Sequence, residues 1–454
     1  MKHSTPQRQS KHSSQGFLDC LRQFLTPVAW KQAQQVCPKK HRSTRWSLHA
    51  VVLPLLLLSW CAGDSLGERF ETARAFYLAS YRKRRQPGKT YSGFQKALAR
   101  LPLPALRVLA ASVRQRLEYH FGHCWQYRGF VPIGCDGSRL TCPRSAELEQ
   151  RLGQAGKDEA APTLWVTALV HLRTGLLWGW RLGKGTASEL VHLKHLIPML
   201  PRLALVVADA AYMDYSLYAD LMNAERFFLA RLSSRAYLYT EQERPLDRFR
   251  EGLVYYWPEK VRDSGRPALR LRLLRLKGGQ HGLWLLTNVL DRKHLTRGMA
   301  SQLYRWRWRN EGLFRAYKCT LKKMKLWGQT VQQVHREAEG SLLAVQLLLA
   351  QGTWAVQRCS QGREVQCSVR GVLRAMRQEI TRLIGQNLGP RQWQNYQERL
   401  ERALLENRRR RSPKERRAWP RRKPHQEPKP PRIHVLTPNL KARIKKDLNS
   451  KKAA

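Results

Sequence analysis

Acidic residues are scarce in this chain. Its 454 residues include 33 Asp and Glu against 83 Lys and Arg, which gives a formal net charge of +50. Charge of this size indicates the kind of partner rather than the fold, and nucleic acid is the natural counterpart. A small basic protein of the ribosomal or chromatin type is a poorer match, because this chain is long and contains 15 Trp. The length suits two to four domains with a large buried core.

Paired cysteines and long apolar runs are also absent. The nine cysteines include no CxxC spacing, which favours reduced thiols in a cytosolic setting. His120, His123 and Cys124 lie close in sequence but lack the paired spacing of a zinc site, so core packing is the favoured interpretation. The longest apolar run, Val51 to Ala62, contains Pro54 and is too short to span a bilayer. We expect a cytoplasmic protein without a signal peptide or a membrane partner.

Changes of sequence pattern predict six parts. Helical periodicity dominates the first part of the chain, strand-like runs follow, and a helical region precedes a basic end of low hydrophobicity. We expect a disordered basic N-terminus, a helical DNA-binding domain, an α/β domain in two pieces, a β-rich insertion, a helical C-terminal region and a disordered basic tail, over residues 1–15, 16–127, 128–232 with 281–357, 233–280, 358–407 and 408–454. A plain helical bundle and a solubilising tail are the alternatives for the second and last parts.

The α/β part predicts a mixed sheet. Its order is three strands, helix, strand, helix, strand. Phe130 to Cys135 is expected to be a strand that runs into Asp136, and Leu203 to Ala208 a buried strand that runs into Asp209. A long apolar helix over Val334 to Val356 is expected to pack against this sheet.

One polar stripe lies on the helix predicted for residues 295–325. At about 100° per residue, Tyr304, Arg307, Glu311 and Lys318 lie within about 60° of one another. A stripe that faces the core would be apolar. Cations suit phosphates, and a carboxylate among cations suits a metal ion. The alternative is a solvated basic helix with an ordinary ion pair between Arg307 and Glu311.

Three carboxylates are therefore candidates for one metal site. Asp136 and Asp209 follow apolar strands, where an unpaired charge is costly, and Glu311 lies on a helix expected across them. Oxygen ligands suit two hard divalent cations, which activate the nucleophile and stabilise the leaving oxygen of a phosphodiester. For either aspartate alone, a helix cap or turn residue is the simpler interpretation.

These residues resemble the motifs of bacterial insertion-sequence DDE transposases. The resemblance rests on Asp136-Gly in the first strand, Asp209-Ala-Ala-Tyr212 in the fourth, and the Y-(2)-R-(3)-E-(6)-K spacing from Tyr304 to Lys318. This spacing is that of the insertion-sequence-four family, which includes the element of transposon five. It implies an RNase H-like mixed sheet with a β-rich insertion, flanked by a helical N-terminal domain and a helical, basic C-terminal region.

The resemblance also implies a metal-dependent reaction on DNA. Asp136, Asp209 and Glu311 would bind two Mg²⁺ or Mn²⁺ ions. Water would cut the element ends, and the freed 3′-hydroxyl would attack target DNA. Phosphate contacts are implied for Arg307, Lys318 and Tyr304, and stacking on a flipped base for Trp284.

The implied partners are double-stranded DNA, as terminal inverted repeats and as target, and a second copy of the chain on that DNA. The implied location is the bacterial cytoplasm, at the nucleoid. Two alternatives remain open: a non-catalytic DNA-binding protein from a decayed element, and a hydrolytic nuclease on the same fold.

Overall fold

The computed structural model describes residues 17–38, 45–81, 86–153, 160–233, 236–242, 245–246, 248–277, 282–359, 368–385, 400–401 and 430–453. The predicted disorder of residues 1–15 lies outside the described residues. The chain forms two compact units, residues 1–119 with 336–409 and residues 120–335 with 410–454.

One apolar helix, α3 (Leu48–Trp60), is the centre of the first unit. The hydroxyl of Ser47 caps it by accepting a hydrogen bond from the N–H of Ala50 at 3.2 Å. Nearly all side chains of α3 are buried, so the other helices surround it. They are α1 (Phe17–Phe24), α2 (Pro27–Gln35), α4 (Leu66–Ser80), α5 (Tyr91–Ala99), α6 (Leu103–Phe121), α13 (Val331–Cys359) and α14 (Val369–Gly385). Among the described residues, no helix is long and apolar enough to cross a membrane.

From residue 336 onward, helix α13 belongs to the first unit, where it packs on α3. A Cβ at Gly340 would lie 2.4 Å from a methyl carbon of Leu55, so the two helices are in direct contact there. Close by, the indole N–H of Trp60 donates to the carbonyl oxygen of Ala344 at 3.2 Å. The small residue Gly340 lets α3 approach α13 closely. An apolar pattern alone shows that α13 is buried but not which element packs against it.

A ten-stranded mixed sheet organises the second unit, in the order β10-β6-β7-β8-β9-β5-β4-β1-β2-β3. β1 (Val131–Thr141), β4 (Ala204–Ala208) and β5 (Phe227–Arg231) pair in parallel. The remaining strands are β2 (Thr163–His171), β3 (Leu176–Lys184), β6 (Tyr237–Thr240), β7 (Glu251–Tyr256), β8 (Leu269–Leu276), β9 (Leu283–Thr287) and β10 (Arg432–Val435). The predicted mixed α/β sheet is confirmed, and the strands of the predicted insertion continue it through β9, which pairs with β5.

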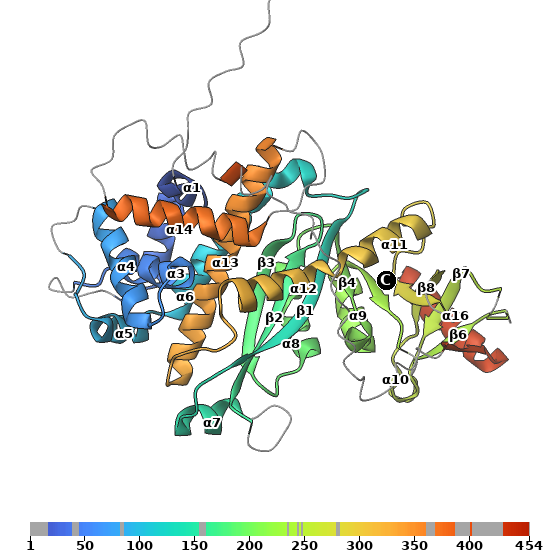
Figure 1. Ribbon diagram of the computed structural model, residues 1–454. Coiled ribbons are helices and arrows are strands. Elements are labelled where there is room, and N and C mark those ends of the chain that lie inside the picture. The colour runs from blue at the N-terminus through green and yellow to red at the C-terminus, as the bar shows by residue number, and fades with distance from the viewer. Residues whose placement is uncertain are drawn as a thin grey trace, which may run out of the picture. The chain divides into compact units, whose positions relative to one another are not determined.

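Two helices cover opposite faces of β1. Gly134 of β1 lies against Asn310 of α12 (Arg309–Arg315), and Gly137 lies against Glu189 of α8 (Glu189–Leu196). Strand residues three apart point to opposite faces, so α12 and α8 lie on different sides of the sheet. Figure 1 shows both helices beside strands β1 to β3. The other helices of this unit are α7 (Ala146–Leu152), α9 (Tyr215–Asn223), α10 (Glu259–Asp263) and α11 (Arg297–Trp306).

Residues 430–453 are folded, although their composition predicts a disordered tail. β10 pairs in parallel with β6 at one edge of the sheet, and α16 (Pro438–Ala453) follows it. Leu436 and Ile444 are buried against Tyr255 and Trp257. Composition misled here because a few well-spaced apolar residues are enough when an uncovered sheet edge is available. Residues 360–367, 386–399, 402–429 and 454 of the predicted C-terminal parts lie outside the described residues.

Candidate active site

Two aspartates lie side by side where β4 ends beside β1. The last register pair of this parallel ladder joins Gly134 to Val207. Two positions further along the strands are Asp136 and Asp209. β4 stops before Asp209, whereas β1 continues beyond Asp136. The sequence therefore placed the two carboxylates on adjacent strands correctly.

Each aspartate uses one carboxylate oxygen to order its own backbone. Oδ1 of Asp136 accepts a hydrogen bond from the N–H of Gly137 at 2.9 Å. Oδ1 of Asp209 accepts one from the N–H of Ala211 at 2.9 Å and caps the 3₁₀ turn Ala210–Tyr212. Among the described residues, nothing donates to the second oxygen of either carboxylate. The prediction that Asp136 closes a strand is wrong, because pairing with β2 carries β1 past it.

Glu311 lies on an interrupted helix. α11 ends before α12 begins, and i→i−3 hydrogen bonds tighten the junction between them. After α12, residues Ala316–Thr320 form a π-helical turn. The prediction of one regular helix over 295–325 is therefore wrong. The positions around the helix axis that the polar stripe assumes are therefore not valid for Lys318, because each irregular turn changes the rotation per residue.

The residue before Glu311 fixes α12 on the sheet. Asn310 is fully buried, and a Cβ on Gly134 would lie 2.5 Å from its Oδ1. Gly134 and Asp136 face the same side of β1, so α12 carries Glu311 across that side. Glu311 is exposed and has no hydrogen bond or ion pair with any described residue. The alternative ion pair with Arg307 is thus not formed.

The charges of the other two predicted ligands, Asp209 and Glu311, both affect the pKa of Asp136. Burial is the main cause that raises the pKa of this carboxyl group. The N–H of Gly137 opposes the shift, the charges of Asp209 and Glu311 add to it, and the guanidinium of Arg307 lowers the pKa. A half-buried carboxylate with two like charges near it is a favourable place for a cation.

Tyr304 and Arg307 lie beside these carboxylates. Tyr304 is 8% exposed, and burial raises its pKa, so the phenol remains a hydrogen-bond donor. The charge of Asp209 raises that pKa further, which indicates that Tyr304 is close to the carboxylates. The Arg307 guanidinium lies 5.6 Å from the ring centroid of Tyr304 and 5.0 Å from that of exposed Trp308. Its Nε is buried and has no hydrogen-bond partner among the described residues.

Residues 135–347 match the family model of the transposase DDE domain. The matched region contains all three carboxylates and supports a DDE transposase. No curated protein matches the chain. Among solved structures, the chain is similar to the piggyBac transposase in a cryo-EM synaptic complex with hairpin DNA, at 12% identity, with 84% of each chain covered and a TM-score of 0.39.

The two other predicted site residues, Lys318 and Trp284, are both partly or fully buried. Lys318 is half-buried on the π-helical turn, where burial lowers its pKa. Trp284 is 6% exposed and packs against Phe249, with the guanidinium of Arg275 5.3 Å from its ring centroid. In this structure Trp284 is a core residue.

A fourth carboxylate near the site was missed from the sequence. Glu189 is the first residue of α8, and Tyr212 donates a hydrogen bond to it. Burial is the main cause that raises the pKa of Glu189, and the charges of Asp136 and Asp209 raise it further. The available signal was an acidic residue in the first turn of the helix that precedes the second aspartate's strand. It was lost because acidic first turns are ordinary helix features.

The donor set fits a hard divalent cation. Asp136, Asp209 and Glu311 offer carboxylate oxygens, the ligands that Mg²⁺ and Mn²⁺ prefer. In the described ranges, no three His, Cys, Asp or Glu side chains are grouped closely enough to enclose a metal ion. Two observations therefore support a metal ion at these three residues: all three offer carboxylate oxygens, and the charges of Asp209 and Glu311 raise the pKa of Asp136. The zinc alternative at His120, His123 and Cys124 gains no support from the structure.

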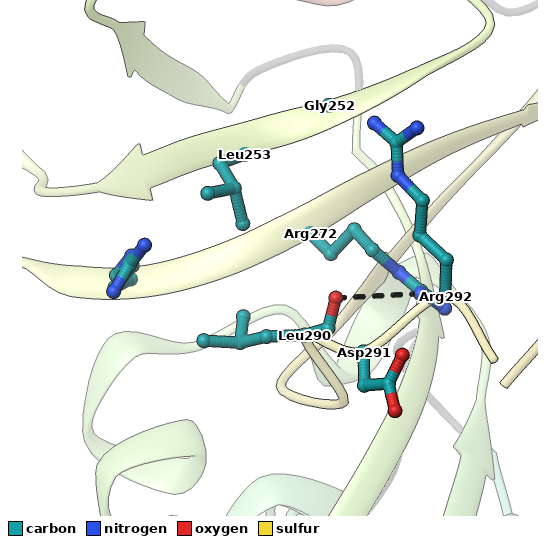
Figure 2. Close-up of a pocket in the computed structure, with 7 residues that line it drawn as sticks. Gly252, Leu253, Arg272, Leu290, Asp291 and Arg292 are labelled. Carbon is teal, nitrogen blue, oxygen red and sulfur yellow. Dashed lines mark hydrogen bonds between the residues drawn. The ribbon is translucent and has the colours of Figure 1, made fainter. Parts of the chain in front are cut away.

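A cavity of about 370 Å³ lies on the insertion, beside β7, β8 and the loop after β9 (Figure 2). Arg272 of β8 is 1% exposed and donates to the carbonyl oxygens of Leu290, at 3.5 Å, and Leu295. Its guanidinium lies 3.6 Å from Glu251. Arg292 is exposed and points away from Arg272 (Figure 2). Nε of Arg292 also lies 3.2 Å from the same Glu251 oxygen, so this carboxylate pairs with both arginines. Arg272 thus fixes the loop that leads into α11.

Proposed function

We propose that this chain is a DDE transposase of the insertion-sequence-four type, which cuts element ends and joins them to target DNA in cut-and-paste transposition. One observation carries the proposal: the β1–β4 register brings Asp136 beside Asp209, on the face of β1 that α12 crosses with Glu311. The transposase DDE match over residues 135–347 supports it. The strand order β5-β4-β1-β2-β3 supports the RNase H-like fold.

Asp136, Asp209 and Glu311 would hold two Mg²⁺ or Mn²⁺ ions. When bound, such ions activate the attacking oxygen and stabilise the leaving oxygen of a phosphodiester. The chain itself supplies the alignment. Backbone hydrogen bonds at 2.9 Å fix one oxygen of each aspartate, and the contact of α12 with β1 fixes the helix that bears Glu311.

Arg307 and Tyr304 would bind the phosphate next to the cut. The Arg307 Nε–H lacks a partner among the described residues, so a phosphate oxygen would satisfy it. Tyr304 keeps its proton and can donate to the same group. Lys318 would contact the DNA backbone further from the cut, since it lies beyond the helix interruption. The burial of Trp284 leaves it without a proposed contact to DNA.

The proposed partners are terminal inverted repeats, target DNA and a second copy of the chain assembled on that DNA. The net charge of +50 supports a polyanionic partner. The proposed location is the bacterial cytoplasm, where such a chain would act at the nucleoid.

The test is an assay with full-length protein and DNA that carries the inverted repeats flanking its coding region. We expect Mg²⁺-dependent nicks at the repeat ends, followed by products in which the freed 3′ ends are joined to a target plasmid. Chelation of the metal should abolish both. Nicks without joined products would indicate a hydrolytic nuclease, and binding without nicks a non-catalytic DNA-binding protein.

A further inference from the structure

The two aspartates lie beyond the hydrogen-bonded ladder that aligns their strands. The last β1–β4 register pair is Gly134 with Val207, two positions before Asp136 and Asp209. The short turn after Asp209 is closed by two backbone hydrogen bonds of 3.3 Å, which are long for N–H···O contacts. Something other than the ladder must hold the Asp209 turn against β1.

Tyr212 makes that connection. It ends the turn that Asp209 caps, and it is 1% exposed. Its hydroxyl accepts a hydrogen bond from Sγ of Cys135 on β1 at 3.4 Å, and donates one to Glu189 on α8. Cys135 is the neighbour of Asp136. One phenol therefore links the Asp209 turn, the Asp136 strand and the first turn of α8.

Glu189 is seated against β1 by the absence of a side chain at Gly137. A Cβ on Gly137 would lie 2.4 Å from Oε1 of Glu189, so any other residue there would displace this carboxylate. Glu189 lies on the opposite face of β1 from α12, where it can accept the Tyr212 hydrogen bond. Tyr212 belongs to the Asp209-Ala-Ala-Tyr motif, in which the proposed chemistry uses only the aspartate.

We propose that Tyr212 and Glu189 are positioning residues that hold the Asp209 carboxylate in place beside Asp136. This inference rests on the proposed function. Groups that orient metal ligands through hydrogen bonds affect metal affinity and activity without touching the ion. The Tyr212 hydrogen bonds to Cys135 and Glu189 form a tether that takes the place of the β1–β4 ladder hydrogen bonds beyond Val207. This tether acts by holding the Asp209 turn in place and not through the charge of Glu189.

The first test compares two Tyr→Phe variants of the full chain. Tyr212→Phe removes the tethering hydroxyl. Tyr218→Phe is the matched control, because Tyr218 is also fully buried but its hydroxyl has no hydrogen-bond partner among the described residues. Mn²⁺ binding is measured by titration calorimetry, nicking on end DNA, and folding by melting temperature. Tyr212→Phe should bind Mn²⁺ about 10- to 100-fold more weakly and nick more slowly. Tyr218→Phe should match wild type in both assays.

The second test asks whether Glu189 acts as an acceptor or as a charge. Glu189→Gln keeps an oxygen that accepts the Tyr212 hydrogen bond, whereas Glu189→Ala removes it. Glu189→Ala should lose as much Mn²⁺ affinity as Tyr212→Phe, and Glu189→Gln should recover most of that loss. This pair decides the question even if Tyr212→Phe does not fold.

Wild-type Mn²⁺ affinity in Tyr212→Phe would overturn the inference alone, as would equal losses in Glu189→Gln and Glu189→Ala. Wild-type protein that neither binds Mn²⁺ nor nicks end DNA would overturn the proposed function together with the inference.

Discussion

The side-chain amide of Asn310 rests on the α-carbon of Gly134, with no room for a Cβ between them. A Cβ there would lie 2.5 Å from Oδ1 and 2.7 Å from Nδ2 of Asn310. Asn310 immediately precedes Glu311, and Gly134 lies two residues before Asp136. The position of one proposed metal ligand relative to another therefore depends on this contact between α12 and β1.

Gly134→Ala should move α12 away from β1. The added methyl group would meet the Asn310 amide and Leu172, so we expect a loss of about 1–3 kcal/mol in the free energy of unfolding, with a larger proportional loss of nicking. Denaturant titration and the nicking assay measure the two effects. Gly312→Ala is the control on the same helix, because nothing lies within 4 Å of its Cβ position. Equal behaviour of the two variants would show that α12 does not need this contact.

Asp136→Asn should make the metal-free protein more stable near neutral pH. The pKa of Asp136 is raised above its ordinary 3.8 by burial and like charge, so the folded state holds this proton more tightly than the unfolded chain does. The resulting stability is complete below the unfolded pKa and is lost as pH rises through the folded pKa. The asparagine avoids that loss. Melting curves across this pH range should show the advantage growing from acid to neutral pH.

Added Mn²⁺ should raise the melting temperature of wild type but not of Asp136→Asn, because a ligand stabilises only the state that binds it. Asp263→Asn, at an exposed position on α10, is the control and should follow wild type throughout. If metal-free Asp136→Asn melted at a lower temperature than metal-free wild type at neutral pH, this result would contradict the electrostatic account of the site.

Sequence reasoning found Asp136 and Asp209 because an apolar strand followed by a carboxylate is a local pattern. The placement of Glu311 also survived, although the helix that bears it is broken, because its contact with β1 depends on Asn310 and not on a regular rotation. Glu189 was missed because its relation to Tyr212 and Gly137 joins residues far apart in sequence. The fold of residues 430–453 depends likewise on a distant sheet edge, which composition cannot reveal.

Ile444→Ala should destabilise the second unit. Ile444 is 5% exposed and packs in the cluster that contains Leu436, Tyr255 and Trp257. Truncation of a buried Ile costs about 2–5 kcal/mol, and we expect the lower end because this cluster is small. Denaturant titration measures the change, and Lys441→Ala on the exposed side of α16 is the control. A wild-type midpoint for Ile444→Ala would show that α16 does not contribute to this fold.

The basic segment 408–429 should contribute to non-specific DNA binding. Replacing it with a neutral Gly-Ser linker of equal length removes its cations but keeps the connection to β10 and α16, which a simple truncation would not. Each lost phosphate contact should reduce the slope of log K against log salt by about 0.9. Binding is measured at several salt concentrations, with nicking on a bound end as the control for an intact site. An unchanged slope would show that this segment is not a DNA-binding arm.

Glu311→Gln tests the central claim most directly. The variant keeps the shape of the side chain but removes the charge that acts on Asp136. Mg²⁺-dependent nicking and joining of end DNA are measured alongside Glu259→Gln, an exposed control on α10. We expect Glu311→Gln to bind end DNA normally and to lose nicking and joining together by several orders of magnitude, since metal activation supplies much of the barrier reduction. Near-normal Mg²⁺-dependent cleavage by Glu311→Gln would contradict the assignment of Asp136, Asp209 and Glu311 as one metal-binding site.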